Sequence, residues 1–207
     1  MTTVNSNRLF SIFPTGYRNL KGEAVLATKP KQVQDIAYVG NYVTSGQARW
    51  ATETLRSMVA TATNEEISDF KKLYFEVATF CGVFSYRNAG SLIQRSPYLV
   101  ADIDDLSSTE EAREIQQKLV NDPNVETALC FVSPKGRGVK WVVEQPDWAQ
   151  NNDFKTTFQM LQQHVGFEYG IAIDKSGSDV CRACFLPYDP ECFINTKYIK
   201  NYHEQLF

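Results

Sequence analysis

Two aspartates, Asp102 and Asp104, alternate with Ile103 at the end of an apolar run that begins at Leu99. Alternate side chains of an extended strand point to the same face, so both carboxylates are predicted to lie together, opposite Ile103. Two neighbouring carboxylates repel each other, and their burial is costly unless a cation neutralises them. Hard oxygen ligands of this kind suit Mg²⁺ or Mn²⁺. The alternative is that Asp104 and Asp105 only end a strand and lead into the next helix.

A second segment whose residues could bind a ligand runs from Ser133 to Lys140. It combines two glycines with three basic residues, namely Gly136, Gly138, Lys135, Arg137 and Lys140. Glycines permit a turn whose backbone amides point at an anion, and the basic side chains add positive charge. The segment is not a Walker A loop, because that motif has a different spacing and precedes a helix, whereas a strand is expected here. The alternative is an ordinary hairpin with solvated charges.

A third segment ends the apolar run Ile171–Ile173 with Asp174, which could bring a third carboxylate beside the first two. Arg182 follows a few residues later. Its guanidinium could grip a phosphate with two parallel hydrogen bonds, or it could pair with Asp179 as a structural salt bridge. The sequence leaves both roles open.

The cysteines and histidines are the residues that could form a zinc site. Cys181 and Cys184, together with Cys192 and His203, have a zinc-like composition. However, Cys181 and Cys184 would face opposite sides of the strand expected there, and no second C-x-x-C pair occurs. We therefore expect free, buried thiols. His164 and His203 are the only histidines and are isolated, which excludes the His-x-His metal pair of rolling-circle nucleases.

The composition bounds the class of protein. The chain has 207 residues, 43% of them hydrophobic, with 21 basic and 24 acidic residues and a net charge of -3. Proteins that coat nucleic acid without specificity are usually basic, so the charge argues mildly against that role. The segment Met1–Pro14 has no signal-peptide pattern, and the longest near-apolar run, Val77–Phe84, is too short to span a bilayer. We expect a cytoplasmic, reduced protein with no membrane partner.

Two patterns divide the chain at about residue 75. The first part predicts an edge strand at Arg8–Pro14 and helices at Gln32–Thr44, Gln47–Thr61 and Asn64–Leu73. The second part predicts helices at Ser108–Asn121 and Asp153–Val165, and strands at Glu76–Phe84, Tyr98–Ile103, Val125–Val132, Val139–Val143, Ile171–Ile173 and Ala183–Leu186. The order β-α-β-β-α-β from Tyr98 to Leu186 is that of a ferredoxin-like (RRM-like) fold. We therefore predict one α+β domain over residues 1–207, with a mainly helical half at 1–74 and a sheet-containing core at 75–207.

Taken together, these segments resemble the N-terminal domain family of virulence-associated E-like proteins of bacterial mobile elements. That family is similar to the archaeo-eukaryotic primase-polymerase superfamily. The matching stretches are Cys81–Phe84, Ser96–Asp105, Ser133–Lys140, and Asp174 through Asp189-Pro190. Their order and spacing are more specific than any one motif.

The resemblance implies roles for individual residues. In the superfamily, a D-x-D pair and a later aspartate bind catalytic metal, and Asp102, Asp104 and Asp174 match them. The superfamily's second motif normally ends in a histidine that contacts nucleotide phosphates, and Lys140 stands at that position. A lysine can hold a triphosphate as a point charge, but it lacks the titration of imidazole near neutral pH.

The expected function is metal-dependent nucleotidyl transfer of the DNA primase/polymerase type in mobile-element replication. The aspartates would hold one or two Mg²⁺ or Mn²⁺ ions. The triphosphate cradle would consist of Ser133, the Gly136–Gly138 turn, Lys140 and Arg182. Trp141 would either stack on nucleic acid or belong to the core.

The expected partners are nucleoside triphosphates, DNA or RNA, and a helicase encoded separately or on a longer chain. One alternative is a noncatalytic nucleic-acid-binding module with the same fold. Another is a protein-protein adaptor of a mobile element, whose acidic cluster would simply end a strand.

Overall fold

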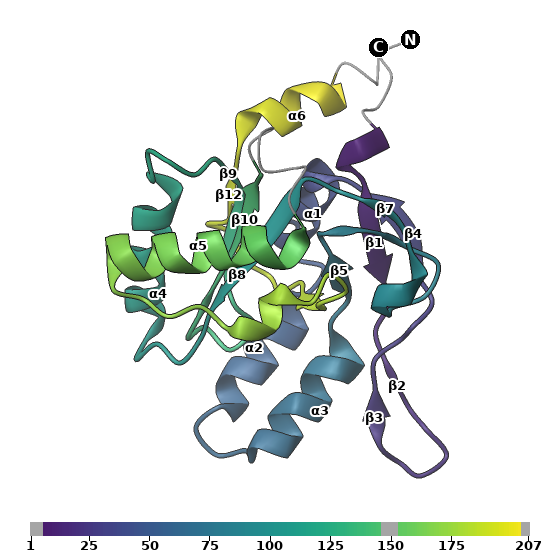
Figure 1. Cartoon of the computed structure of the whole chain (residues 1–207). Helices are drawn as coiled ribbons and strands as arrows, with labels where there is room; N and C mark the ends of the chain where they lie inside the picture. Colours follow the sequence, from purple (N-terminus) through teal and green to yellow (C-terminus); the bar gives the residue numbers. More distant parts are fainter. Residues whose placement is uncertain (1–5, 146–152, 204–207) are drawn as a thin grey trace.

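Two four-stranded antiparallel sheets form the centre of this computed structural model, which describes residues 6–145 and 153–203 (Figure 1). The first sheet has the order β11-β5-β1-β4, formed by Cys184–Phe185, Val77–Thr79, Phe10–Phe13 and Gln32–Gln34. The second has the order β12-β9-β10-β8, formed by Phe193–Ile194, Thr127–Val132, Val139–Glu144 and Tyr98–Ile103. Two small hairpins pair β2 with β3 and β6 with β7, over Tyr17–Arg18, Ala24–Val25, Gly82–Phe84 and Leu92–Arg95.

The helices are α1 to α6, at Ile36–Thr44, Arg49–Met58, Asn64–Tyr74, Thr109–Val120, Phe154–Tyr169 and Thr196–His203. Local signals set several of their ends. The side chains of Ser108 and Asp153 accept hydrogen bonds from backbone amides of the first turns of α4 and α5. Gly170 ends α5 in the left-handed conformation, at φ 66°. Within the described part of the chain, none of the helices has the length and apolar character needed to cross a membrane.

The second sheet contains a split β-α-β unit. Strand β10 is antiparallel to both β8 and β9, so those two strands run in the same direction with β10 between them, and α4 connects them. The chain is therefore of the α+β class, as predicted.

The last two strands of the predicted ferredoxin-like order do not form as expected. Residues 171–173 form no strand, and a single backbone hydrogen bond, from the amide of Asp174 to the carbonyl of Asp102 at 2.9 Å, links this segment to β8. Asp174 then turns the chain by accepting a hydrogen bond from the amide of Ser176. The predicted strand at Ala183–Leu186 shortens to β11 and pairs with β5 in the first sheet.

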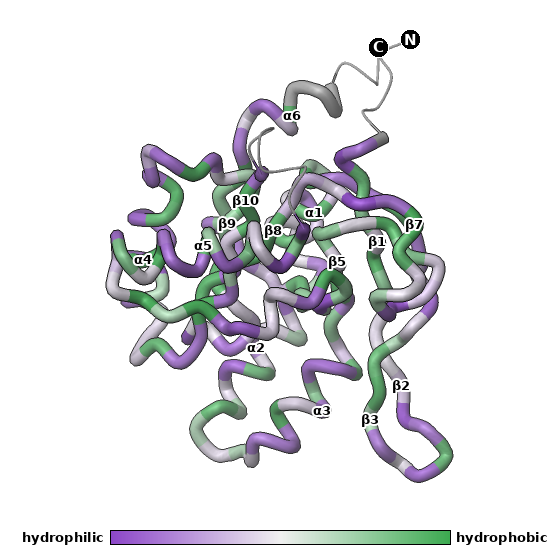
Figure 2. Tube along the Cα trace, in the orientation of Figure 1, coloured by the Kyte–Doolittle hydropathy of each residue, from purple (hydrophilic) through white to green (hydrophobic). Residues whose placement is uncertain are grey.

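Helices cover one face of the second sheet. Leu99, Ala101 and Ile103 of β8 pack against buried residues of α4 and α5. In Figure 2 these two helices alternate between hydrophilic and hydrophobic residues, as expected for helices with one buried face. Trp141 lies in this layer with no exposed surface, and its indole N–H donates to Thr127 Oγ1 at 2.7 Å. The core alternative for Trp141 is therefore correct, and the stacking role is wrong.

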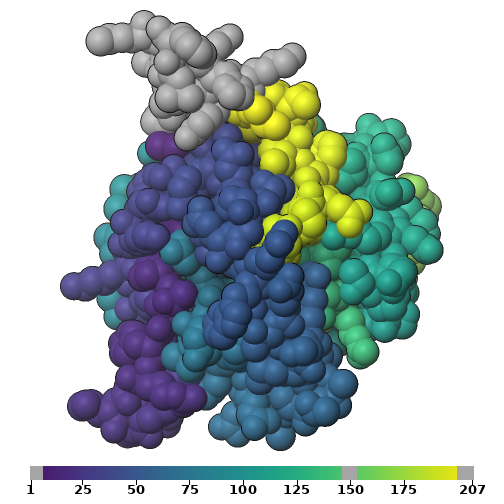
Figure 3. Space-filling model, turned by 180° about the vertical axis from the view of Figure 1, so that it is seen from behind, coloured from purple at the N-terminus to yellow at the C-terminus, as the bar shows by residue number. Residues whose placement is uncertain are grey.

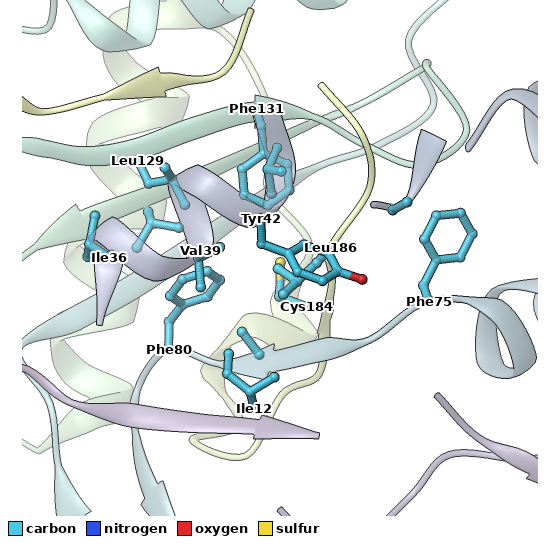
Figure 4. Packing of buried hydrophobic residues seen from close by; sticks show 14 of the residues in the cluster. Ile12, Ile36, Val39, Tyr42, Phe75, Phe80, Leu129, Phe131, Cys184 and Leu186 are labelled. Atoms are coloured by element: carbon cyan, nitrogen blue, oxygen red, sulfur yellow. The ribbon is translucent and has the colours of Figure 1, made fainter. Parts of the chain in front are cut away.

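The opposite face of the second sheet meets the first sheet through α1. Ile36, Val39 and Tyr42 of α1 belong to one cluster with Leu129 and Phe131 of β9 (Figure 4). Residues of the first sheet and its connections, among them Ile12, Phe80, Cys184 and Leu186, complete the cluster. Helix α1 also contacts β12 and α6, and Figure 3 shows this yellow C-terminal segment between the blue N-terminal helices and the teal part of the chain.

Three N-terminal expectations need correction. The strand at Arg8–Pro14 is not an edge strand, because β1 pairs with both β4 and β5. The helix expected at Gln32–Thr44 is a strand followed by a helix, since the Asp35 side chain caps α1 by accepting from the amide of Tyr38 at 2.9 Å. The strand expected at Glu76–Phe84 divides into β5 and β6, which belong to different sheets. Residues 36–74 hold three helices, whereas residues 10–34 form strands.

The close approach of β8 to the start of β10 predicts a glycine requirement. A Cβ atom at Gly138 would lie 2.5 Å from the carbonyl oxygen of Ile103. We expect Gly138→Ala to lower the free energy of unfolding by roughly 1–3 kcal/mol, as overpacking typically does. The control is Gly166→Ala in α5, where a Cβ meets nothing within 4 Å. Because alanine favours the helix over glycine, this substitution should raise the free energy of unfolding by up to about 1 kcal/mol. Urea unfolding of both variants checks this, and equal stabilities would contradict it.

Candidate functional site

Asp102, Asp104 and Asp174 come together at the end of β8. One carboxylate oxygen from each residue can be chosen so that all three lie within 4.8 Å of one another. Asp102 and Asp104 face the space between the two sheets, while Ile103 points into the layer under α4 and α5, as the alternation predicts. The segment after α5 brings Asp174 alongside through its backbone hydrogen bond to Asp102. The structure thus unites the three carboxylates, and metal binding by them stays a prediction.

The backbone turns sharply directly after the triad's first two members. Asp105 has a φ of 59°, a left-handed conformation that is uncommon outside glycine but better tolerated by Asp and Asn. The amide of Leu106 then donates to the carbonyl of Arg137 at 3.1 Å. Gly138 allows this crossing, because any larger residue would also crowd Asp104 Oδ1. The turn at Ser133–Gly138 therefore fixes where the strand carrying Asp102 ends.

Each end of the triad has its own cation. Lys140 stands directly opposite Asp102 in the β8–β10 register. Its ammonium forms a close ion pair with Asp102 Oδ1 and lies 3.8 Å from Asp104 Oδ1. Arg182 Nη2 contacts Asp174 Oδ2 at 2.9 Å. The sequence left open whether Arg182 binds a phosphate or pairs with Asp179. In the structure it forms an ion pair, but its partner is Asp174 rather than Asp179.

The charges in this cluster depend on one another. Burial raises the pKa of Asp102, which Lys140 opposes and the neighbouring Asp104 charge reinforces. Burial also works against the charge of Lys140, but the Asp102 and Asp104 carboxylates outweigh it and raise the Lys140 pKa. For Asp174, burial is outweighed by hydrogen bonds from Ser176 and by Arg182, so its pKa lies below the ordinary value. Removing either partner of the Asp102–Lys140 pair would leave a buried charge without compensation.

A cleft of about 260 Å³ opens beside Asp102 and Asp104. Its basic lining residues are Lys71, Arg87, Lys135, Lys140 and Arg182, and its acidic ones are Asp102, Asp104 and Asp179. Apolar surface comes from Leu26, Pro134, Ala183 and Phe185. The side chain of Ser133 also lines the cleft, and its buried hydroxyl has no hydrogen-bond partner. Cations and a free hydroxyl next to a carboxylate cluster suit an anionic ligand that brings a divalent metal with it.

The sequence did not predict two of the cleft's cations, Lys71 and Arg87. Lys71 lies on α3, where burial and the nearby Lys135 and Lys140 lower its pKa. Arg87 follows β6 and donates through Nε to the carbonyl of Ala27 at 3.4 Å. Neither belongs to a local motif, so only the packing of the first sheet beside the second could reveal them.

The two glycines of the basic turn shape the site without lining it. Gly136 has a φ of 79°, and its amide donates to the carbonyl of Ser133 at 2.9 Å, which leaves that amide unable to bind an anion. A Cβ at Gly136 would face Thr109 and Arg56 rather than the cleft. Neither glycine is among the residues lining the cleft. Anion binding by the Gly136–Gly138 turn stays a prediction.

The cysteines occupy separate surroundings. Cys184 belongs to the cluster around α1, whereas Cys181 packs in a smaller cluster with Phe13 and Val77. Burial raises the pKa of Cys184 to about 12 and that of Cys181 to about 11, so both are thiols near neutral pH. In the described residues, the aspartate triad is the one group of three or more His, Cys, Asp or Glu side chains close enough to share a metal ion.

Asp189 supports the turn from inside the protein. Its side chain is fully buried, and its Oδ2 accepts from the amide of Val132, directly before Ser133, at 2.7 Å. Arg113 of α4 binds the same carboxylate through both terminal nitrogens. The bidentate pair ties α4 and the end of β9 to the segment before β12. This gives a physical role to the Asp189-Pro190 stretch of the sequence.

The fold and site define an α+β protein with a carboxylate triad at the end of a sheet strand and a cation-lined cleft beside it. A family model described as BT4734-like, N-terminal domain, matches residues 69–193, which is more than half of the chain. The chain belongs to this family. The matched region contains all of the cleft's lining residues except Leu26. The comparisons with curated proteins and with solved structures gave no match.

The contrast between Asp189 and Glu191 yields a prediction. Both contact Arg113 Nη2, but Asp189 is fully buried, whereas the Glu191 side chain is 72% exposed. We expect Asp189→Ala to lower the free energy of unfolding by about 3–5 kcal/mol, because Arg113 loses its buried bidentate partner and the buried Val132 amide loses its acceptor. Glu191→Ala should change it by less than about 1 kcal/mol. Chemical denaturation measures both, and equal losses would contradict the anchoring role of Asp189.

Proposed function

We propose that the chain is a metal-dependent nucleotidyl transferase of the DNA primase/polymerase type that acts in the replication of a mobile element. The observation that carries the proposal is the carboxylate triad, two of whose members, Asp102 and Asp104, line a cleft with five basic side chains. An acidic cluster alone could be a strand end, and a basic cleft alone could bind any anion. Their adjacency suits a triphosphate that bridges a divalent ion and protein cations.

The donor set fits Mg²⁺ or Mn²⁺. It offers only carboxylate oxygens, which are hard ligands, and contains no imidazole or thiolate that would favour zinc. Asp102, Asp104 and Asp174 would hold the metal. Such an ion would neutralise charge on the phosphates and lower the pKa of an attacking hydroxyl.

The chain's own residues would bind and orient the nucleotide. Lys140 and Arg182 stand at the two ends of the triad and would attract the phosphate oxygens. The unpartnered Ser133 hydroxyl would donate a hydrogen bond to the same group. Lys71, Lys135 and Arg87 would extend the positive surface along the cleft, and Leu26 and Phe185 offer apolar contact there. The nucleic-acid partner would be DNA or RNA, with a helicase encoded separately or on a longer chain.

A noncatalytic nucleic-acid-binding module with this fold is the second candidate. It is favoured by the ion pairs at the triad, since Lys140 and Arg182 already neutralise two of the three carboxylates. This candidate predicts nucleic-acid binding that needs no metal, and no incorporation of nucleotides.

The metal assignment is tested with the double variant Asp102→Asn/Asp104→Asn. We expect Mn²⁺ and a nucleoside triphosphate to bind the wild type in calorimetric titrations. The double variant should lose Mn²⁺ binding and the nucleotide binding that depends on it. We also expect it to lose primer synthesis or extension by at least about 100-fold, as removal of essential electrostatic groups commonly causes.

Asp105→Asn is the matched control. The Asp105 side chain is 93% exposed, and asparagine tolerates the left-handed conformation found there. This variant should therefore keep wild-type behaviour. A folded wild type that binds no Mn²⁺, or a double variant with undiminished activity, would refute the enzymatic proposal.

A further inference from the structure

The Lys140 ammonium occupies the position where the first two carboxylates of the triad meet. Strand register places Lys140 opposite Asp102, and the ammonium also lies 3.8 Å from Asp104 Oδ1. The contact is enclosed, because the side chains of Lys140 and Asp102 are only 10% and 14% exposed. Asp102 and Asp104 thus already have a cation between them.

A divalent metal would compete directly with this ammonium. Mg²⁺ requires carboxylate oxygens at about 2.0–2.1 Å, and Lys140 Nζ is in contact with Asp102 Oδ1, one of the oxygens available for that purpose. Two cations at adjoining positions repel each other strongly in a poorly solvated site. A metal bound to Asp102 Oδ1 and the ammonium in its present position therefore compete for the same oxygen.

The displaced ammonium has somewhere to go. A lysine is a point charge on a flexible four-carbon stem, and Lys140 lines the cleft together with the unpartnered hydroxyl of Ser133. Arg182 is a poorer candidate for the same role, because its ion pair is with Asp174 and its side chain is 44% exposed. Asp174 is also held in place by Ser176 through its other oxygen.

We propose that Lys140 is an exchangeable internal cation, which metal displaces from Asp102 and Asp104 and which then binds the phosphates of the incoming nucleotide. This inference rests on the proposed function. It makes metal binding and nucleotide binding mutually reinforcing, since each moves Lys140 toward the same position. By linkage, the gain in nucleotide affinity caused by metal equals the gain in metal affinity caused by nucleotide.

The first test is a titration of Mn²⁺ into wild type, Lys140→Met and Lys135→Met without nucleotide, followed by calorimetry or by the electron paramagnetic resonance signal of free Mn²⁺. Lys140→Met should bind Mn²⁺ at least about fivefold more tightly than wild type, the lower end of ordinary coupling between sites. Lys135→Met removes the same charge from the cleft but has no contact with the triad, since its ion pair is with Asp105 at 4.0 Å. It should stay within about twofold of wild type.

The second test separates exchange from simple charge repulsion. In the presence of a chelator, Asp102→Asn should strengthen nucleoside triphosphate binding by at least about fivefold, because Lys140 is then free without metal. In a Lys140→Met background the same substitution should give no such gain, which a double-mutant cycle measures directly. Lys140→Gln replaces Lys140→Met if the latter does not fold.

The outcomes distinguish the two proposals. Equal Mn²⁺ affinities in wild type and Lys140→Met, with metal still bound through the aspartates, would overturn the exchange and leave the metal site intact. An additive double-mutant cycle would overturn it as well. Folded wild-type and variant proteins that all fail to bind Mn²⁺ would refute the proposed function, and the exchange with it. Tighter binding by Lys140→Met together with a non-additive cycle supports the exchange.

Discussion

The pairing of a buried carboxylate with a buried ammonium across two neighbouring strands governs the site. Asp102 on β8 and Lys140 on β10 stand opposite each other, and each makes the burial of the other's charge tolerable. A register shift of one residue in either strand would turn that strand's charged side chain into the apolar layer under α4 and α5, away from its partner. The sheet's hydrophobic alternation and its charged site therefore enforce the same register.

The turn between β9 and β10 must be held rigidly for that register to persist. Asp189 grips the end of β9 through the amide of Val132, while Arg113 neutralises its charge and connects it to α4. Gly138 allows β10 to begin within contact distance of Ile103 and Asp104. Buried polar groups that do not themselves line the cleft thus determine the position of the side chains inside it. This arrangement is costly to break, because several of these groups have no access to water.

The two sheets contribute different chemistry to the cleft. The second sheet supplies the carboxylates and Lys140, whereas α3, β11 and the segment after β6 supply Lys71, Phe185 and Arg87. Helix α1 fills the space between the sheets with apolar side chains and so fixes their separation (Figure 4). A ligand in the cleft would contact segments from residue 26 to residue 185. Its affinity would therefore depend on the packing of the whole core.

The sequence by itself determined the local features. Alternation defined β8 at Tyr98–Ile103 and put Asp102 and Asp104 on one face, and capping-box and helical spacing located the starts of α4 and α5. These features follow from side-chain periodicity and hydrogen bonds a few residues apart. Only the tertiary structure decided that β11 leaves the expected sheet to pair with β5, that Trp141 is buried, and that Lys71 and Arg87 reach the cleft. Those outcomes depend on contacts between segments far apart in the chain, where burial and strand pairing are shared among many residues and no local pattern records the partner.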